Sequence, residues 1–138
     1  LVTDVIDTMY NEMPIALLDT SAVCHMPDVL EMPYRPRAFV WDAPPDGPEP
    51  YRLASESGEH LTRLGGPTCL AGDIVGDYDF GREIVAGDRL VFCDMAIYTM
   101  VKTNTFNGMP LPAIYLWDGH ELKCVKQFGY EDFKMRLS

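Results

Sequence analysis

Short apolar runs rich in β-branched and aromatic residues alternate with turn-forming residues along this chain. Alternation of this kind is typical of short strands joined by turns. The runs that predict strands cover residues 2–6, 15–18, 38–41, 51–54, 89–93, 114–117 and 122–128. Their spacing predicts a mainly β fold, an antiparallel barrel or sandwich.

Turn chemistry predicts two hairpins. Asp118-Gly119 separates the apolar runs at 114–117 and 122–128, and Ala86-Gly87-Asp88 comes directly before the run at 89–93. Asp-Gly pairs favour the positive φ angles that tight hairpin turns need. We expect the hairpin around Asp118 to be the clearer of the two.

Four stretches depart from the strand pattern. Residues 44–50 are rich in proline, which lacks the N–H that a strand ladder needs, so an exposed loop is expected there. Residues 27–36 are also typical of a loop. A short helix capped by Asp94 is predicted over residues 94–103, and another over residues 130–137.

The composition is that of one folded domain. Apolar residues make up 47% and charged residues 23% of the 138 residues. A chain of this length buries roughly two thirds of its unfolded surface, which provides a core without crosslinks. We therefore expect a single folded domain over residues 1–138.

The chain is acidic, with a formal charge of −10 from 21 acidic and 11 basic residues. Nucleic-acid binding depends on Lys and Arg side chains that neutralise phosphates, so no nucleic-acid partner is expected. An acidic surface favours solubility and also attracts cationic small molecules.

The cysteines stand far apart and form no CxxC pair. They are Cys24, Cys69, Cys93 and Cys124. No histidine completes a zinc-ligand spacing with them, so no metal site is expected. Free thiols indicate a reducing compartment, and the cytoplasm is the expected location.

The sequence shows no apolar run long enough to span a membrane and no signal-peptide pattern, so no membrane partner is expected. The chain begins without Met and directly in strand-like sequence. We therefore expect it to be part of a longer protein.

A glycine-rich turn carries the clearest candidate chemistry. Gly65-Gly66-Pro67 predicts a tight bend before Cys69, and Gly72 allows a second bend before Asp73. Such a turn directs a thiol and a carboxylate toward a ligand. The same residues are equally compatible with a buried, unreactive thiol at Cys69 and a turn-capping role for Asp73.

Further candidate residues lie on both sides of this turn. The ring of Tyr98 is expected to pack in the core while its hydroxyl seeks a partner, with a phosphate oxygen as one candidate. Asn107-Gly108 predicts a turn with positive φ. Asp28 is a candidate partner for a cationic substrate group, and His25 is expected to be a hydrogen-bonded structural histidine.

Together these segments resemble the C-terminal part of the carboxynorspermidine (carboxyspermidine) decarboxylases, which are pyridoxal-phosphate enzymes of polyamine synthesis. The resemblance covers residues 11–22, the block CHMPDVLEMPYRP at 24–36, and residues 65–76, 98–111 and 126–130. The block at 24–36 is specific to this family. Gly-Pro-Thr-Cys alone indicates only the wider group that includes ornithine and diaminopimelate decarboxylases.

The resemblance implies a fold and a setting. Enzymes of this group have an N-terminal α/β barrel that binds pyridoxal phosphate through a lysine, followed by a C-terminal β-barrel domain like that of alanine racemase. Residues 1–138 resemble the second domain, with short helices, so the cofactor lysine is expected outside this chain. A homodimer whose active site is shared between subunits is also implied.

The resemblance also implies residue roles. Cys69 matches the cysteine that enters the active site from the other subunit and directs the return of a proton after decarboxylation. Tyr98 matches the tyrosine that contacts the cofactor phosphate. Asp28 matches a substrate-contacting position whose carboxylate pairs with a distal amine of the polyamine, and Asp73 is a further expected substrate contact.

Two alternatives stay open. One is a regulatory or dimerisation module, as found among inactive relatives of ornithine decarboxylase. The other is a related diaminopimelate, ornithine or arginine decarboxylase, although the block at 24–36 fits these poorly. The sequence does not distinguish norspermidine from spermidine precursors.

Overall fold

The computed structural model of this chain describes residues 1–41 and 53–137. Its strands are β1 (Val2–Asn11), β2 (Met13–Leu18), β3 (Ala38–Val40), β4 (Thr62–Gly65), β5 (Ile74–Tyr78), β6 (Arg89–Phe92), β7 (Ile114–Trp117) and β8 (Leu122–Lys126). Its helices are α1 (Ala22–His25), α2 (Asp28–Glu31), α3 (Tyr98–Val101), the 3₁₀ turn η1 (Phe106–Gly108) and α4 (Tyr130–Leu137).

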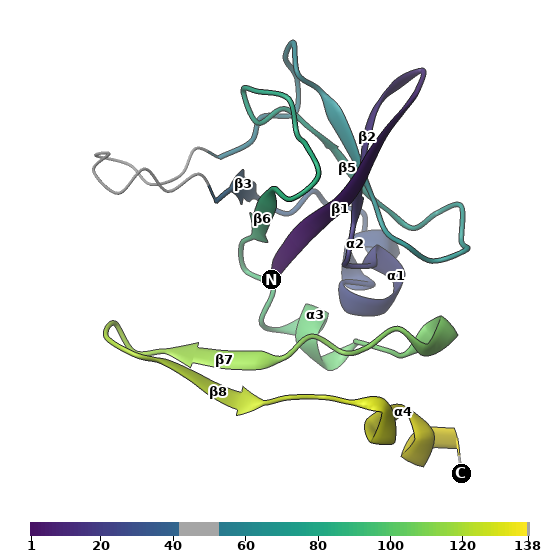
Figure 1. Ribbon diagram of the computed structural model, residues 1–138, viewed down its shortest axis with the longest axis vertical. Coiled ribbons are helices and arrows are strands. Elements are labelled where there is room, and N and C mark those ends of the chain that lie inside the picture. The colour runs from purple at the N-terminus through teal and green to yellow at the C-terminus, as the bar shows by residue number, and fades with distance from the viewer. Residues whose placement is uncertain (42–52, 138) are drawn as a thin grey trace.

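Six strands form one curled sheet, and β7 and β8 form a separate hairpin beneath it (Figure 1). The order in the large sheet is β3-β6-β1-β2-β4-β5, and β2 runs parallel to β4 while the other neighbours are antiparallel. The predicted mainly β fold with short helices is confirmed. The prediction that all strands pair antiparallel is wrong for β2 and β4. The chain between them crosses over through α1 and α2, so that β4 runs in the same direction as β2.

The long strand β1 produces much of the curl. Its first residues pair with β6, as Val2 does with Val91, while its pairing with β2 extends to Asn11 opposite Met13. The register shifts between Val5 and Asp7, and a bulge of this kind bends a strand and increases its twist.

One face of the curled sheet encloses the hydrophobic core. The core residues are Val5, Ala16, Leu18, Ala22, Met26, Val29, Ala38, Val40, Leu64, Val75, Tyr78, Phe80, Ile84, Leu90 and Phe92. These positions alternate along β2, β4 and β6 with more exposed ones, as expected for strands that cover a core on one face. The crossover contributes Ala22 from α1, Val29 from α2 and Met26 between them, and the segment between β5 and β6 contributes Phe80 and Ile84.

Several local predictions are confirmed. The hairpin at Asp118-Gly119 forms with Trp117 opposite Leu122, and α4 spans the residues predicted for it. The predicted strand at 51–54 lies partly outside the described residues, and its Leu53 forms an isolated bridge to Phe39. The predicted loop at 44–50 also lies outside them.

Other local predictions are wrong. Helix α3 is shorter than the predicted 94–103, and Asp94 does not cap it, because Asp94 has a φ of 60° and Ile97 occupies the N-cap position. Gly87 does turn the chain with a φ of 93°, but β6 then pairs with β1 and β3 instead of closing a hairpin. A helix, α2, lies within the segment 27–36 that was expected to be a loop.

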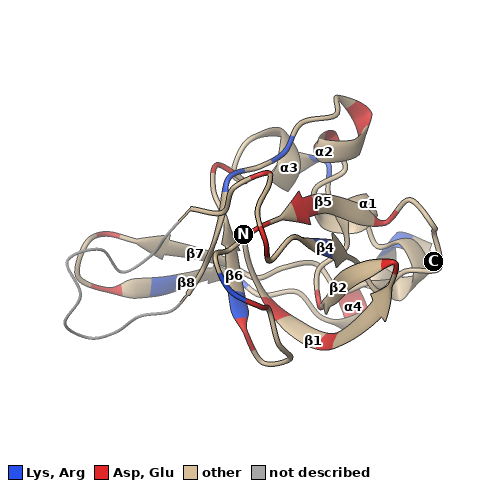
Figure 2. Ribbon diagram, turned by 90° about the horizontal axis from the view of Figure 1, so that it is seen from above, with Lys and Arg blue, Asp and Glu red and all other residues tan. Residues whose placement is uncertain are grey.

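The C-terminal part of the chain is far more exposed than the sheet. Every residue of β8 is exposed, and α4 buries none of its residues. Of the helices within the described ranges, none has the length and apolar character to cross a bilayer. Acidic positions are spread over many elements and outnumber basic ones (Figure 2).

Candidate active site

The glycine-rich turn between β4 and β5 presents Cys69 to solvent. Cys69 is an exposed free thiol, so the expectation of a buried and unreactive residue does not describe it. The turn is closed by Gly66 N–H, which donates to the Asp73 carbonyl at 2.8 Å, and by Asp73 N–H, which donates to the Leu70 carbonyl at 3.0 Å. The backbone therefore holds the thiol at the tip of a short, tied turn.

The carboxylate of Asp73 lies inside this turn and is only 3% exposed. Its Oδ2 accepts from the backbone N–H of Thr68 at 3.2 Å and the Thr68 hydroxyl at 2.6 Å. Its Oδ1 accepts from the Ser21 hydroxyl at 3.0 Å and from Val23 N–H at 3.2 Å. A Cβ at Gly66 would lie 2.3 Å from Asp73 Oδ2, which explains the glycine there.

The 3₁₀ turn η1, from later in the chain, contacts Cys69. Asn107 has a φ of 57°, and Gly108 follows with a φ of 75°, as the sequence predicted for this pair. The Asn107 side-chain amide Nδ2 donates to Cys69 Sγ at 3.2 Å. Residues 38 positions apart in the sequence thus share one contact.

Helix α1 lies beneath both turns. His25 at its end is 3% exposed, and its Nδ1 accepts from Ser21 N–H at 3.2 Å. The ring proton is therefore on Nε2, which donates to the Pro110 carbonyl at 2.9 Å. Burial lowers the pKa of His25, which keeps the imidazole neutral. His25 is the hydrogen-bonded structural histidine that the sequence predicted.

Asp28, at the start of α2, forms a second polar group. Its Oδ2 accepts from the Tyr34 hydroxyl at 2.6 Å and from the Thr99 hydroxyl at 3.0 Å. Its Oδ1 is buried and has no hydrogen-bond partner among the residues that the structure describes. A buried carboxylate oxygen without a partner is costly unless a donor reaches it, so this atom is a good acceptor for a cation.

Tyr98 begins α3, directly before the Thr99 that contacts Asp28. Its side chain is largely exposed, with 68% of the residue surface accessible, so the expectation that its ring packs in the core is wrong. Lys102 lies one turn further on, with Nζ 5.9 Å from the centre of the Tyr98 ring, and pairs with Glu31 of α2. Tyr98 thus begins the helix whose Thr99 hydroxyl contacts Asp28.

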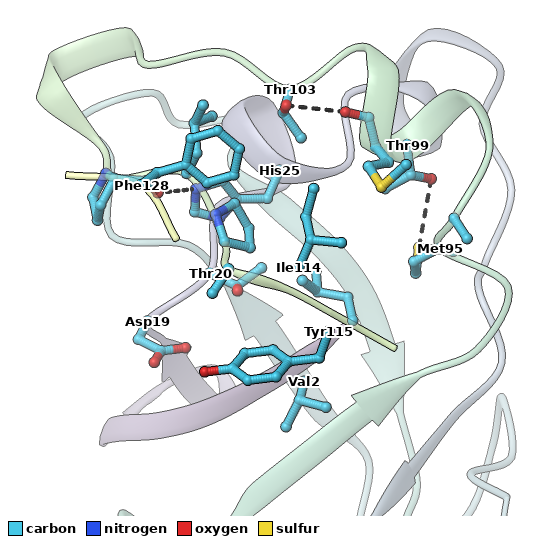
Figure 3. A pocket seen from close by; sticks show the side chains of 17 residues that line it. Val2, Asp19, Thr20, His25, Met95, Thr99, Thr103, Ile114, Tyr115 and Phe128 are labelled. Carbon is cyan, nitrogen blue, oxygen red and sulfur yellow. Dashed lines mark hydrogen bonds between the residues drawn. The ribbon is translucent and has the colours of Figure 1, made fainter. Parts of the chain in front are cut away.

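A cavity of about 580 Å³ lies between the large sheet and the segment that leads into β7 (Figure 3). His25, Thr99 and Tyr115 are among the residues that line it, together with Asp19 and Thr20 from the end of β2. The cavity depends on the C-terminal segment, because Pro110, Ile114 and Phe128 complete its lining.

The residues of the described ranges contain no group of three or more His, Cys, Asp or Glu side chains that could hold a metal ion. Cys24 differs from Cys69, because it is buried and that burial raises the pKa of its thiol. Of these two thiols, only Cys69 is placed for solution chemistry.

Comparison with known proteins assigns the fold to a family. Residues 1–96 match the family described as "Pyridoxal-dependent decarboxylase, C-terminal sheet domain". This chain belongs to that family. The match covers the large sheet, the glycine-rich turn and helices α1 and α2, and it ends before Tyr98 and Thr99.

Several decarboxylases of this kind resemble the chain along its whole length. Carboxyaminopropylagmatine decarboxylase of Synechocystis sp. is 47% identical over 137 residues, which are 99% of this chain and 32% of that protein. Carboxynorspermidine/carboxyspermidine decarboxylase of Campylobacter jejuni is 39% identical over 99% of this chain and 36% of that protein. The chain thus spans about a third of the length of these relatives.

Solved structures agree with this assignment. The crystal structure of carboxynorspermidine decarboxylase from Campylobacter jejuni, complexed with norspermidine, matches with a TM-score of 0.80 and 39% identity. The match covers 99% of this chain and 37% of that one. A diaminopimelate decarboxylase shares the fold with a TM-score of 0.71 at 21% identity, over 99% of this chain and 33% of that one.

Within this decarboxylase domain, the structure brings the predicted site residues into two groups. Cys69 lies against Asn107, and Asp28 lies beside the helix that Tyr98 begins. Asp73 joins the Cys69 turn to α1 from inside the fold. Thr99 and the Asn107 amide were not predicted as site residues. For Asn107, the Asn-Gly turn was the feature of the sequence that could have pointed to it.

Proposed function

We propose that this chain is the C-terminal domain of a pyridoxal-phosphate decarboxylase that acts on a carboxylated polyamine. The reaction would release carbon dioxide from carboxynorspermidine or carboxyspermidine and leave norspermidine or spermidine. The observation that carries the proposal is the 39% identity, over nearly the whole chain, to a carboxynorspermidine decarboxylase whose structure contains norspermidine. The exposed thiol and the unpaired carboxylate oxygen described above support it.

Cys69 is the residue that we assign to catalysis. Pyridoxal phosphate supplies the electron sink for the loss of carbon dioxide, which leaves the protein to control where a proton returns. An exposed thiol at the tip of a tied turn suits this task, because it is accessible and its position is fixed. We assign to Cys69 the delivery of a proton to the carbon that carried the carboxylate.

Asp28 is the residue that we assign to the distal amine of the substrate. An ammonium group is a donor and a cation, and Asp28 Oδ1 is a buried acceptor without a partner in the described structure. The other oxygen, held by Tyr34 and Thr99, fixes the direction in which the free one faces. Charge pairing of this kind gains strength where water is excluded.

We assign Tyr98, on the exposed side of helix α3, to the cofactor. The Tyr98 hydroxyl is accessible to a phosphate oxygen held by another domain, and this is the contact that we assign to it. The lysine that anchors the cofactor would lie in an N-terminal α/β barrel, since the relatives are about three times as long as this chain. We further propose a cytoplasmic homodimer in which Cys69 serves the partner's site.

Asp73 has weaker support as a substrate contact. Its carboxylate already accepts four hydrogen bonds from within the fold, so no oxygen is left for an ammonium group. We therefore assign Asp73 to the support of the Cys69 turn.

A second substrate is favoured by one specific observation. The identity to carboxyaminopropylagmatine decarboxylase is 47%, against 39% to the Campylobacter jejuni enzyme. Its substrate name indicates a carboxylated polyamine that ends in a guanidinium instead of an ammonium. Asp28 suits either cation, because a carboxylate accepts from both.

The test compares these substrates in the complete protein that carries this domain, supplied with pyridoxal phosphate. Carbon dioxide release and formation of the decarboxylated polyamine are both measured with carboxynorspermidine, carboxyspermidine and carboxyaminopropylagmatine. Cys69→Ala should lower formation of the decarboxylated polyamine by about a hundredfold or more, which is the scale of a lost proton donor. Cys124→Ala, a change of another exposed thiol on β8, is the matched control.

Two results would contradict the proposal. One is the absence of carbon dioxide release with all three substrates. The other is an unchanged rate and product for Cys69→Ala, which would favour the regulatory or dimerisation module instead.

A further inference from the structure

The contact between Asn107 and Cys69 joins two turns that are each built with little freedom. Asn107 adopts the left-handed region, which Asn and Gly tolerate better than other residues, and Gly108 continues the turn. In this conformation its amide points its Nδ2 at the sulfur, 3.2 Å away. The contact depends on an unusual backbone shape as well as on a side chain.

The segment that carries Asn107 is attached to α1 at several points. Asn104 N–H donates to the Cys24 carbonyl at 2.9 Å, and the Asn104 amide donates to the Val23 carbonyl at 2.8 Å. The Cys24 thiol donates to the Phe106 carbonyl at 3.7 Å. These contacts leave η1 little room to move relative to the helix.

The turn that carries Cys69 is attached to the same helix through Asp73. This carboxylate accepts from Ser21 and Val23 at the start of α1 on one side and from Thr68, the neighbour of Cys69, on the other. Helix α1 is therefore the common base of both turns. The Asn107 amide and the Cys69 sulfur meet because each is fixed to it.

We propose that Asn107 is a positioning residue that holds the Cys69 thiol for proton transfer. This inference rests on the proposed function. A thiol has one hydrogen and acceptor lone pairs, so an amide that donates to the sulfur leaves the S–H bond free to face the substrate. When the proton leaves sulfur and forms a C–H bond, the electron pair of the S–H bond stays on sulfur. The resulting thiolate then regains a proton from water.

The Asn107 amide has its largest effect when Cys69 is a thiolate. A hydrogen bond to an ionised acceptor is about twice as strong as one between neutral groups. The Asn107 N–H donor therefore stabilises the thiolate more than the thiol, which favours the transfer. The required donor is present in the fold before any substrate arrives.

The test uses thiol chemistry, which does not depend on decarboxylation. The rate of alkylation of Cys69 by iodoacetamide at pH 7.5 is followed by peptide mapping in the purified protein. Asn107→Asp keeps the shape and tolerates positive φ but replaces the donor with an acceptor, while Asn107→Gly removes the amide and keeps the backbone freedom. Glu12→Gly, at another residue with positive φ in the turn between β1 and β2, is the matched control.

We expect Cys69 alkylation to slow about tenfold in Asn107→Asp and about threefold in Asn107→Gly, the scale of one hydrogen bond net of its exchange with water. Glu12→Gly should alkylate like the unsubstituted protein. Equal or faster alkylation in both Asn107 variants would overturn the proposal. If Asn107→Asp does not fold, the glycine variant decides alone.

The kinetic constants separate this inference from the proposed function. In a protein that decarboxylates a carboxylated polyamine, Asn107→Asp should lower kcat with little change in KM, and an unchanged kcat overturns the positioning role while leaving the function intact. Slower alkylation in a protein without decarboxylase activity would reject the proposed function and uphold the contact between Asn107 and Cys69.

Discussion

The sheet body, β1 to β6 with α1 and α2, differs sharply from the C-terminal segment, residues 114–137. The sheet body encloses the whole hydrophobic core, whereas the C-terminal segment exposes most of its apolar side chains. Both are rich in apolar residues, and Ile-Tyr-Leu-Trp of β7 has the composition of a core strand. An apolar run therefore does not by itself predict burial within this chain, because the buried apolar side chains of the described residues all lie between Val5 and Phe92.

Shortening one leucine in each region should give the largest difference in stability. Leu18 is 0% exposed and Leu116 is 62% exposed. Leu18→Ala should lower the free energy of unfolding by about 2–5 kcal/mol, because it removes packed atoms and leaves a cavity. Leu116→Ala should change it by less than about 0.5 kcal/mol. Urea unfolding followed by circular dichroism measures both, and similar losses would show that the C-terminal segment is packed in solution.

A pair of aspartate substitutions gives the next effect. Asp73→Asn places an amide N–H₂ group against hydrogen-bond donors, which leaves buried donors without acceptors. The expected loss is about 1–3 kcal/mol of unfolding free energy. Asp132→Asn, on the exposed helix α4, should leave the urea midpoint unchanged. An unaffected midpoint for Asp73→Asn would remove the structural role assigned to its carboxylate.

The smallest expected effect concerns pH. Burial lowers the pKa of His25 in the folded state, so the unfolded chain binds more protons below about pH 6.5. Stability should therefore fall as the pH drops from about 6.5 toward the lower folded pKa, by at most about 1.4 kcal/mol per pH unit. Urea midpoints between pH 5 and 8 measure this slope.

The matched variants for this slope are both histidine-to-glutamine changes. His25→Gln should flatten the slope, and His120→Gln, on the exposed turn of the C-terminal hairpin, is the control. A slope that persists in His25→Gln must come from other groups and would contradict the assignment to His25.

Strong local patterns in the sequence predicted the fold best. The apolar runs marked most of the strands, and the turn residues marked the hairpin at Asp118 and helix α4. The strands β4 and β5 escaped, because their glycines and charged residues hide the alternation of buried Leu64 and Val75. Helix α1 is one turn long and depends on the Ser21 hydroxyl, which accepts from Cys24 N–H, so no periodicity could reveal it.

The site was predictable in its parts and not in its arrangement. The turn around Cys69 and the positive φ of Asn107 both follow from local chemistry. Their contact does not, because it depends on how two distant turns rest on the same helix. Two of the four hydrogen bonds to Asp73 likewise come from residues far away in the sequence, and all four are the basis on which we propose that Asp73 supports the turn.

The parallel pairing of β2 with β4 has a consequence for the folding pathway. It places Ile15 opposite Arg63, so the long intervening chain must fold back before this seam can close. Loop closure over such a distance costs entropy before any contact compensates for it, and non-local pairing slows folding. The hairpin of β4 and β5 can form early by itself, and we expect the seam to close last and to set the folding rate.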